Sequence, residues 1–324
     1  MLTAVQPTKP GYRPYRVQVV AIRRVSCCFA RITFTGVDLG DFGTGGRDQR
    51  IKVILPLPGE RFGDFGQDDP DSIQRGEWYL RWRELPDHDR NPIRTYTVRA
   101  VRPAMAEIDV DFVSHGDTGP ASAWVGRARA GDELLLVGPD ATSPNSGGGI
   151  EWHPGSASRV LLVGDETALP AISAILETLE PGVRGHAIVE VPHQADRLLL
   201  PLRPGLSIDW IVRDRTEGSA SDAHSAVAAW VAAHGRSDPN DSPDDPASEL
   251  EDVDIDSEGS LLWEVPEAFE AESATTGFED LYVWVAGEAS KVKLIRRFLV
   301  SESGLDRHQV AFMGYWRAGR AEAS

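Results

Sequence analysis

The chain has 324 residues, a length that suits two domains with sizeable hydrophobic cores. No apolar run follows a basic N-terminus and no apolar stretch is long enough to cross a membrane, so the sequence predicts neither a secreted nor a membrane protein. The cysteines, Cys27 and Cys28, are adjacent, and on a strand they would point to opposite faces, so we expect core residues rather than a disulfide. Together these features indicate a reducing cytoplasm.

The net charge of −17 at pH 7 is concentrated in one segment. Of the 50 acidic residues, 17 lie between Ser237 and Ser290, where there is no Lys, Arg or His, which leaves 33 acidic against 33 basic residues elsewhere. We expect a solvated or disordered acidic insertion at about residues 237–260, with a partner-binding acidic segment as the alternative. The residues after it, 261–266, are candidates for a short docked element. No basic surface with interleaved aromatic residues is visible, so nucleic-acid binding is not expected.

The N-terminal half alternates short β-branched runs with turns that contain Gly or Pro. These runs predict an antiparallel β-barrel domain over residues 10–145. One helix is expected at Pro120–Ala128, where apolar residues recur at helical spacing, and a long polar loop at residues 60–74. The predicted strands are Tyr15–Val25, Cys28–Thr35, Ile51–Leu55, Ile93–Val101, Ile108–Ser114 and Glu133–Val137.

The pattern changes after a link rich in Gly, Ser and Pro at Asp140–Gly155. Arg159–Val163 is an almost continuous apolar run, typical of a strand buried on both faces, and a helix follows with Thr167 as the expected N-cap. Alternating strands and helices predict a parallel, doubly wound, Rossmann-like α/β domain over residues 156–324. Its further strands are expected at His186–Val191, Ile208–Val212, Leu281–Ala286 and Gln309–Met313, and its further helices near Ser221–His234 and Ser290–Glu302.

The most informative residues are Arg94–Arg99, on a strand-like run, and His115–Ser122, in a turn that follows one strand later. Arginine binds phosphate as a planar fork, Tyr96 offers a stacking face, and Thr97 can hydrogen-bond a ring nitrogen. Gly119 lets backbone N–H groups approach phosphate oxygens closely. The pattern indicates a flavin site. The alternative is an ordinary barrel strand, because Thr-Tyr-Thr-Val is also good β sequence.

Two turns in the second half indicate a dinucleotide site. Ligands of open α/β sheets bind beyond the carboxyl ends of the strands, where the N-terminus of the next helix favours a pyrophosphate. The usual G-x-G-x-x-G fingerprint is absent, and plain scaffold turns are the alternative. The expected NAD(P)H-binding residues are Gly164, Asp165, Glu166, Ala286, Gly287 and Glu288.

Taken in order, the motifs of the chain resemble the siderophore-interacting protein family, a branch of the ferredoxin–NADP reductase superfamily. They are Arg94-Thr-Tyr-Thr-Val-Arg99, Asp111–Ser122, Gly131-Asp-Glu133, Val163–Ala171, Val285-Ala-Gly-Glu288 and Gly314-Tyr-Trp-Arg317. The resemblance implies a cytoplasmic FAD enzyme that reduces the iron of an imported ferric siderophore, with electrons from NADH, NADPH or a ferredoxin-type carrier. The FAD-binding residues that it implies are Arg94, Thr95, Tyr96, Thr97, Asp111, Phe112, Val113, His115, Gly119, Pro120, Ala121, Ser122, Thr167 and Ala168.

The substrate-binding candidates are two cations, because an anionic chelate needs positive charge near the flavin. Lys52 matches a lysine position that the family associates with this role, and Arg317 near the C-terminus is the second candidate. Their alternative is solvated surface charge. No His/Cys cluster has metal-ligand spacing, so we expect no metal site in the protein and iron bound only as its chelate.

Two other functions stay open. One is a reductase that passes electrons between NADPH and ferredoxin or flavodoxin, although the His115 motif and the Gly314-Tyr-Trp-Arg317 ending weigh against it. The other is a non-catalytic flavin- or siderophore-binding protein. The nicotinamide preference is undecided, because only His193 and Arg197 near the second strand of the nucleotide domain lean toward NADPH. We expect a monomer.

Overall fold

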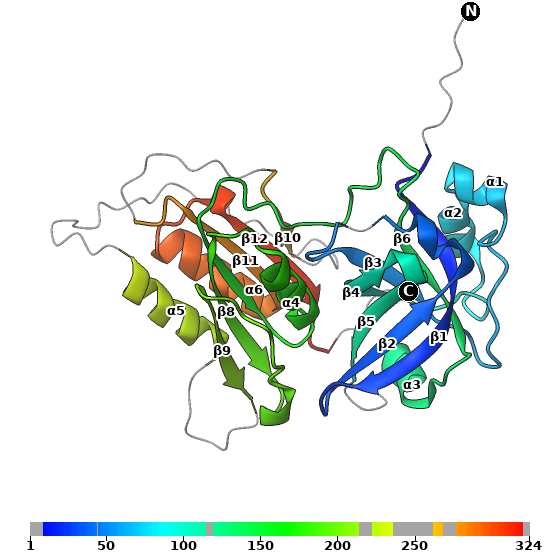
Figure 1. Cartoon of the computed structure of the whole chain (residues 1–324), viewed down its shortest axis with the longest axis horizontal. Helices are drawn as coiled ribbons and strands as arrows, with labels where there is room; N and C mark the ends of the chain where they lie inside the picture. The colour runs from blue at the N-terminus through cyan, green and yellow to red at the C-terminus, as the bar shows by residue number, and fades with distance from the viewer. Residues whose placement is uncertain are drawn as a thin grey trace, which may run out of the picture. The chain divides into compact units, whose positions relative to one another are not determined.

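The computed structural model describes residues 9–43, 45–114, 119–213, 222–235, 262–267 and 277–319. The chain divides into two compact units, one comprising residues up to Ile150 together with Ser173–Thr178, the other Glu151–Ile172 and Leu179–Ala321 (Figure 1). His115 and the predicted acidic insertion at about residues 237–260 lie outside the described residues.

The first unit is built on a closed antiparallel barrel with the strand order β1-β2-β5-β4-β3-β6. This confirms the barrel predicted from the short β-branched runs. Alternate residues of the strands, such as Tyr15 and Phe34, point inward and form a buried core, which Trp124 of a following helix joins. The strands are β1 (Tyr12–Arg24), β2 (Phe29–Thr35), β3 (Arg50–Ile54), β4 (Ile93–Arg102), β5 (Glu107–Val113) and β6 (Glu133–Pro139).

The expectation of a single helix in this unit and of a loop throughout residues 60–74 is wrong. Two short helices, α1 (Pro70–Arg75) and α2 (Glu77–Glu84), follow β3, and Gly76 between them has a φ of 70°. The side chain of Asp69 caps α1, and Pro70 stands in its first turn. Trp78 and Trp82 lie one helical turn apart on α2 and pack against apolar side chains of β3, β4 and β6. No helix was predicted in this segment because it is mostly polar, although Trp78 and Trp82 attach it to the barrel.

The predicted helix after β5 is confirmed as α3 (Pro120–Arg127). Ala121 and Trp124 are its buried residues, and Trp124 packs against Phe112 of β5 with ring centroids 6.0 Å apart. Because this contact fixes the helix to the barrel, the N-terminus of α3 is held next to the end of β5.

The second unit is a mostly parallel sheet with the order β10-β12-β11-β7-β8-β9. The strands β9, β8, β7, β11 and β12 are parallel, which confirms the doubly wound α/β prediction, and the short edge strand β10 is antiparallel to β12. Residues 263–264 therefore do form a short ordered element. The strands are β7 (Arg159–Gly164), β8 (Arg184–Val191), β9 (Leu206–Val212), β10 (Trp263–Glu264), β11 (Leu281–Glu288) and β12 (Val310–Trp316).

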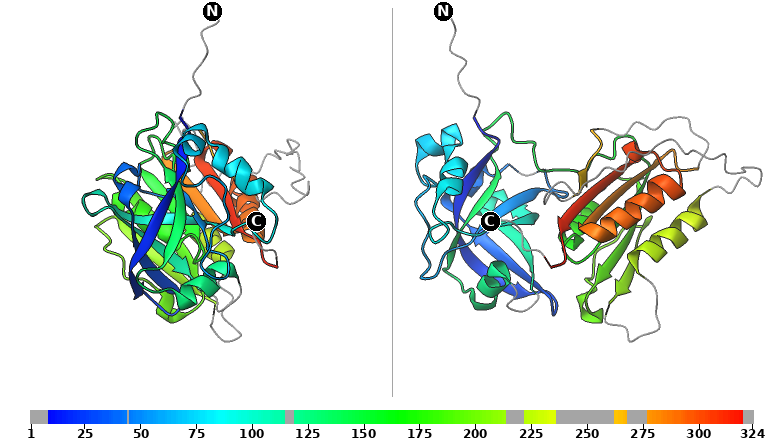
Figure 2. Two further views of the ribbon diagram at one scale, coloured as in Figure 1. Left: turned by 90° about the vertical axis from the view of Figure 1, so that its right-hand side faces the viewer. Right: turned by 180° about the vertical axis from the view of Figure 1, so that it is seen from behind.

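Helices cover the sheet of the second unit. Helices α5 (Ala223–His234) and α6 (Ala289–Arg296) run side by side on one face, and their apolar residues join those of β7 and β11 in one core (Figure 2). A π-helical turn at Arg297–Glu302 continues α6. Helix α4 (Leu169–Thr178) follows β7. Short 3-10 turns lie at Val37–Asp41, Pro103–Met105, Gln194–Asp196 and Arg307–Gln309.

Among the helices of the described residues, none combines the length and the apolar character needed to cross a membrane.

Candidate functional site

Strand β4 carries the Arg-Thr-Tyr-Thr motif, and its pairing with β3 assigns each side chain to a face of the sheet. Tyr96 is paired with Ile51 and Arg94 with Val53, whereas Thr95 is paired with Lys52. Directly opposite residues of neighbouring strands share a face, and Ile51 and Val53 belong to the buried barrel core. The structure thus brings Arg94 and Tyr96 together on one face and places Thr95 and Thr97 on the other.

Arg94 is poised to bind an anion. Its side chain is half-buried, and its guanidinium donates a hydrogen bond to the Ile93 carbonyl at 2.7 Å. Within the described part of the chain it has no carboxylate partner, whereas Arg31 and Arg102 on the same barrel are bound to Asp111 and Asp109. A guanidinium that keeps its charge unneutralised at a half-buried position suits a phosphate.

Tyr96, Phe112 and Asp111 already contact other side chains of the barrel. The Tyr96 ring lies 4.4 Å from that of Phe112, which is fully buried. Asp111 accepts two hydrogen bonds from the Arg31 guanidinium, at 2.6 and 2.8 Å. The side chains of Asp111 and Phe112 therefore already serve the barrel. That Asp111, Phe112 and Val113 bind FAD stays a prediction.

The N-terminus of α3 is the second candidate anion site of the barrel. Its N-cap is Gly119, no side chain of the described residues caps it, and no acidic residue stands in its first turn. The amides of Ala121 and Ser122, which follow Pro120, therefore lack intrahelical acceptors. Gly119 has a φ of 169°, an extended conformation open to any residue, and a Cβ built there would meet nothing within 4 Å. Neither backbone strain nor packing within the described residues explains this glycine. That Arg94 and the N-terminus of α3 bind the phosphates of FAD stays a prediction.

Lys52 lies on the opposite face of the sheet from Arg94 and Tyr96. Its ammonium donates a hydrogen bond to the Thr95 hydroxyl at 2.6 Å. Lys52, a predicted substrate residue, therefore contacts Thr95, a predicted cofactor residue. This hydrogen bond orients the lysine side chain on its face of the sheet.

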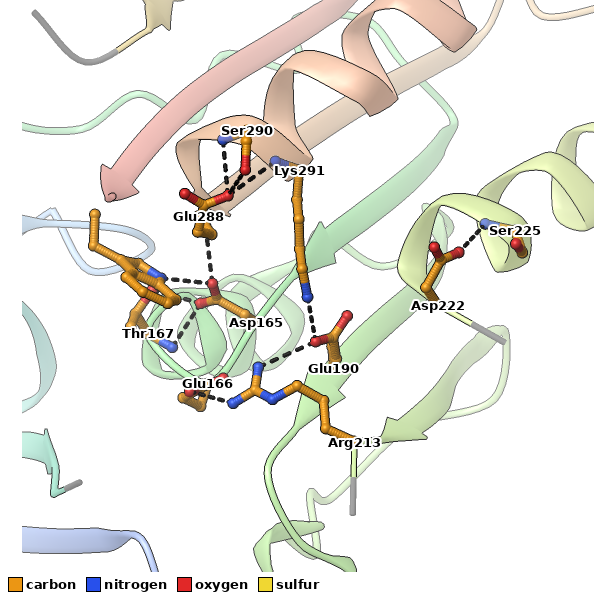
Figure 3. Close-up of polar contacts among 11 residues, drawn as sticks. Asp165, Glu166, Thr167, Glu190, Arg213, Asp222, Ser225, Glu288, Ser290 and Lys291 are labelled. Atoms are coloured by element: carbon orange, nitrogen blue, oxygen red, sulfur yellow. Dashed lines mark hydrogen bonds and ion pairs between the residues drawn. The ribbon is translucent and has the colours of Figure 1, made fainter. Parts of the chain in front are cut away.

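In the second unit, Asp165 joins the ends of three strands of the sheet (Figure 3). Its Oδ1 accepts hydrogen bonds from the Thr167 amide at 2.9 Å and the Thr167 hydroxyl at 2.5 Å. Its Oδ2 accepts from the Glu288 amide at 2.9 Å and from the Trp316 indole at 2.8 Å. Burial and the nearby Glu166 carboxylate raise the pKa of Asp165, against these hydrogen bonds. The N-cap of α4 is Ala168, so the expectation that Thr167 caps this helix is wrong. The Thr167 hydroxyl is instead taken up by Asp165.

The predicted anion site at the start of α6 is filled by the protein itself. The Glu288 carboxylate accepts hydrogen bonds from the Ser290 amide at 2.8 Å and the Lys291 amide at 3.1 Å (Figure 3). Gly287 has a φ of 148°, and a Cβ there would lie 2.7 Å from Asp165 Oδ2. At Gly164 a Cβ would lie 2.6 Å from the Ala168 side chain. Both glycines are thus explained by close packing, without a phosphate.

Sequence reasoning missed a charged cluster at the same edge of the sheet. Arg213, just after β9, donates to Glu166 at 2.5 Å and to Glu190 at 3.1 Å, and Lys291 donates to Glu190 at 2.5 Å (Figure 3). Burial opposes the charge of Arg213, but the two carboxylates outweigh it and raise its pKa. The signal available in the sequence was Glu190, a charged residue in the apolar second half of β8. A small pocket of the second unit is lined by residues of this edge, including Asp165, Glu190, Ala286, Glu288 and Lys291.

The remaining candidates lie on the surface. His193 precedes the 3-10 turn that follows β8, and Arg197 ends it. Arg317 follows β12 directly, and its exposed side chain has no hydrogen bond or ion pair within the described residues.

Comparison with known proteins assigns both units. Residues 18–143 match the family model described as the siderophore-interacting FAD-binding domain, and residues 157–319 match that described as siderophore-interacting protein. The ferric vibriobactin reductase ViuB of Vibrio cholerae is 28% identical over 309 residues, which cover 95% of this chain and 91% of that protein. An NADPH-dependent ferric-chelate reductase of Escherichia coli is 30% identical over 241 residues, which cover 71% of this chain and 86% of that protein.

Solved structures agree with this assignment. The siderophore-interacting protein SipS from Aeromonas hydrophila is 30% identical, with a TM-score of 0.62 over 96% of this chain and 94% of that chain. The fold also matches the ferredoxin reductase of carbazole 1,9a-dioxygenase, at 13% identity and a TM-score of 0.56 over 94% of this chain and 70% of that chain. With a barrel that matches the FAD-binding model and an α/β unit that matches the second model, the chain belongs to the siderophore-interacting protein family.

Proposed function

We propose that the protein is an FAD-dependent reductase that takes electrons from NADPH or NADH and reduces the iron of a ferric siderophore in the cytoplasm. The observation that carries this proposal is a pair of anion-binding features on the FAD domain, the Arg94 guanidinium and the N-terminus of α3, which has no side-chain cap among the described residues. The names of two relatives, a ferric vibriobactin reductase and a ferric-chelate reductase, support the substrate class.

The chemistry of iron makes reduction a route to release. Siderophores bind iron through hard, anionic oxygen ligands, which prefer Fe(III) to Fe(II), so one added electron weakens the complex. FAD, when bound, supplies the needed conversion, because it accepts a hydride and passes on single electrons. In this chain Arg94 and the amides of Ala121 and Ser122 would hold its phosphates, and Tyr96 would contact its ring or ribityl portion. Lys52 would attract the anionic chelate.

The N-terminus of α6 does not offer a phosphate site for the electron donor, because Glu288 already caps it. Arg213 and Lys291 contact carboxylates at the carboxyl edge of the sheet, and we assign these two cations to a nucleotide phosphate. Glu166 and Glu190 hold them now, so a phosphate must displace these carboxylates to bind. A ferredoxin-type carrier is therefore the alternative donor. We expect the protein to act as a monomer.

An anaerobic spectroscopic titration tests the proposal. The yellow protein should bleach when NADPH or NADH is added, because reduction removes the visible absorbance of the oxidised flavin. This absorbance should return when a ferric siderophore is added. If only a reduced ferredoxin bleaches the protein, the electron donor is a carrier protein and not a nicotinamide. Return of colour with oxidised ferredoxin or flavodoxin but not with the chelate would identify the rival reductase. A protein that no donor bleaches would be a flavin- or siderophore-binding protein without catalysis.

A further inference from the structure

The connection between β8 and β9 carries an exposed apolar run. It passes from the 3-10 turn at Gln194–Asp196 to the start of β9 without a helix, and it contains the sequence Arg197-Leu-Leu-Leu-Pro-Leu-Arg203. Half-buried and exposed residues alternate along it, so that Leu199 and Pro201 face outward, and Leu199 is 100% exposed. Single exposed leucines are ordinary on protein surfaces, whereas a continuous run of four leucines and a proline marks an interaction site.

The path of this segment explains why its apolar residues reach the surface. The strands β7, β8 and β9 are consecutive in the sheet, so the connection through α4 and the connection from β8 to β9 step in the same direction. Because crossovers between parallel strands are right-handed, both connections lie on the same face of the sheet. The segment thus stands in the place of a crossover helix. Its half-buried leucines, Leu198, Leu200 and Leu202, face inward, and the outward residues are left to the solvent.

Arginines flank the apolar run at both ends and keep their charge. At one end, Arg197 is exposed, and its side chain has no hydrogen bond or ion pair within the described residues. At the other end, the Arg203 guanidinium donates to the carbonyls of Glu180 and Val183 at 2.7 and 3.0 Å, which hold it without neutralising it. The exposed Arg184 starts β8, next to the end of the segment, because β8 and β9 are paired from their first residues.

A lipid surface fits this combination better than a protein partner does. Segments that dock on membranes place apolar side chains at the boundary between headgroups and acyl chains, while flanking arginines bind the anionic headgroups. One extended segment is far smaller than the surface of a stable protein interface, which buries roughly 800 Å² on each partner. A bilayer, by contrast, needs no complementary surface, so a short apolar run between cations is sufficient. A contact of this kind also needs no spanning helix.

We propose that the segment Arg197–Arg203 docks the protein reversibly on an anionic phospholipid bilayer. In this arrangement Leu199 and Pro201 enter the boundary between headgroups and acyl chains, and the arginines at both ends of the segment bind lipid phosphates. The inference goes beyond the proposed function and does not depend on it, because docking involves neither the flavin nor the chelate.

Vesicle flotation of the flavin-loaded protein tests the inference, without electron donor or chelate. The probes are vesicles of phosphatidylcholine alone and vesicles of equal parts phosphatidylcholine and phosphatidylglycerol, each at low and at high salt. Leu199→Ser removes the outward aliphatic side chain, and Arg197→Ala removes a flanking charge. The matched controls are Leu294→Ser, at a leucine of α6 that is 57% exposed, and Arg307→Ala, at an exposed arginine before β12.

We expect the parent protein to bind the anionic vesicles at low salt, and to bind less at high salt or without phosphatidylglycerol, because screening weakens the arginine contacts. Leu199→Ser should lower the partition coefficient about tenfold, the lower end of the effect of burying a leucine side chain. Arg197→Ala should lower it about fivefold on anionic vesicles only. Both control variants should partition like the parent protein.

The outcomes that overturn the inference are distinct. They are no binding to anionic vesicles, binding that ignores both Leu199→Ser and Arg197→Ala, and an equal loss from Leu199→Ser and Leu294→Ser. Sedimentation without lipid covers the other occupant: a dimer that Leu199→Ser abolishes, without vesicle binding, would assign the segment to a contact between two copies of the chain. Flavin content and the thermal midpoint show whether each variant is folded, and Leu199→Gln is the second variant should Leu199→Ser not fold. A protein that binds vesicles but does not reduce a ferric chelate would refute the proposed function alone.

Discussion

At the scale of single residues, two glycines of the predicted sites are present for opposite reasons. A side chain at Gly287 would collide with Asp165, and its φ of 148° disfavours any other residue. At Gly119 the backbone is extended and the space for a Cβ is empty. Contacts within the protein explain the first glycine, whereas no contact of the described residues explains the second. Its place at the N-terminus of α3 suits a flavin phosphate.

We therefore expect Gly119→Ala to fold normally and to lose flavin. The methyl group has room in the protein, and alanine at an N-cap costs only a few tenths to about 1 kcal/mol relative to glycine. It would, however, obstruct a phosphate that approaches the backbone. Flavin absorbance per protein after dialysis, together with the thermal midpoint, measures both effects. Gly287→Ala is the contrasting variant and should lower the thermal midpoint. Full flavin retention by Gly119→Ala would show that the phosphates bind elsewhere.

The second prediction at this scale concerns Arg94. A hydrogen bond to a charged group contributes about 1.5–3 kcal/mol, so Arg94→Ala should weaken flavin binding by roughly tenfold or more. Arg94→Lys keeps the charge but not the planar fork, so its dissociation constant for FAD should lie between those of the parent protein and Arg94→Ala. Titration of the apoprotein with FAD measures each dissociation constant. An unchanged constant for Arg94→Ala would remove this residue from the site.

At the scale of elements, the periodic segments were predictable and the exceptions have local causes. The six barrel strands and the parallel strands of the second unit were predicted from short runs of β-branched residues. In such runs the pattern of apolar residues reflects which side chains are buried. Helices α1 and α2 were missed because their anchors, Trp78 and Trp82, stand in a polar context. Strand β10 was not assigned as a strand, because two residues carry no periodicity and the strand exists only through its pairing with β12.

The cap of α6 gives a pH-dependent prediction. Burial acts to raise the pKa of Glu288, but hydrogen bonds from Ser290 and from the amides of Ala318 and Lys291 outweigh it and hold this pKa below its usual value. A depressed pKa of an acid stabilises the fold above the unfolded-state value of 4.5, and this stabilisation is lost as the pH falls through the folded-state value. Glu288→Gln should thus cost about 1 kcal/mol in the free energy of unfolding at pH 7 and less at pH 4.

Urea unfolding of the parent protein and of Glu288→Gln at both pH values measures this difference. Glu302→Gln, a change at an exposed residue of the π-helical turn, is the matched control and should show little effect at either pH. A cost for Glu288→Gln that stays constant from pH 7 to pH 4 would mean that the ionised carboxylate is not the source of the stabilisation.

At the scale of the whole molecule, the fold class could be predicted from sequence, whereas the carboxyl-edge network could not. Asp165, Glu190, Arg213 and Glu288 are separated by up to 123 positions, and no local pattern shows which carboxylate meets which donor. The flavin motif was visible because its residues are contiguous on one strand. Alternation along the strand already places Arg94 and Tyr96 on one face and Thr95 on the other. Strand pairing adds which face this is, because Arg94 and Tyr96 pair with Val53 and Ile51 of the barrel core. Motifs of neighbouring residues can therefore be recognised in the sequence, whereas contacts between the ends of distant strands cannot.

The distribution of charge over the whole chain leads to the last prediction. Residues 238–256 contain nine acidic and no basic residues, so their deletion changes the net charge from −17 to −8. They contain no aromatic residue, and we expect the deletion to leave flavin content and thermal midpoint unchanged. Because net negative charge repels an anionic ligand over roughly a Debye length, about 10 Å at 0.1 M salt, kcat/KM for a trianionic chelate should rise at low salt and the gain should vanish at high salt. A neutral chelate is the control and should respond to neither change. An equal gain for both chelates would show that the segment acts by obstruction rather than by charge.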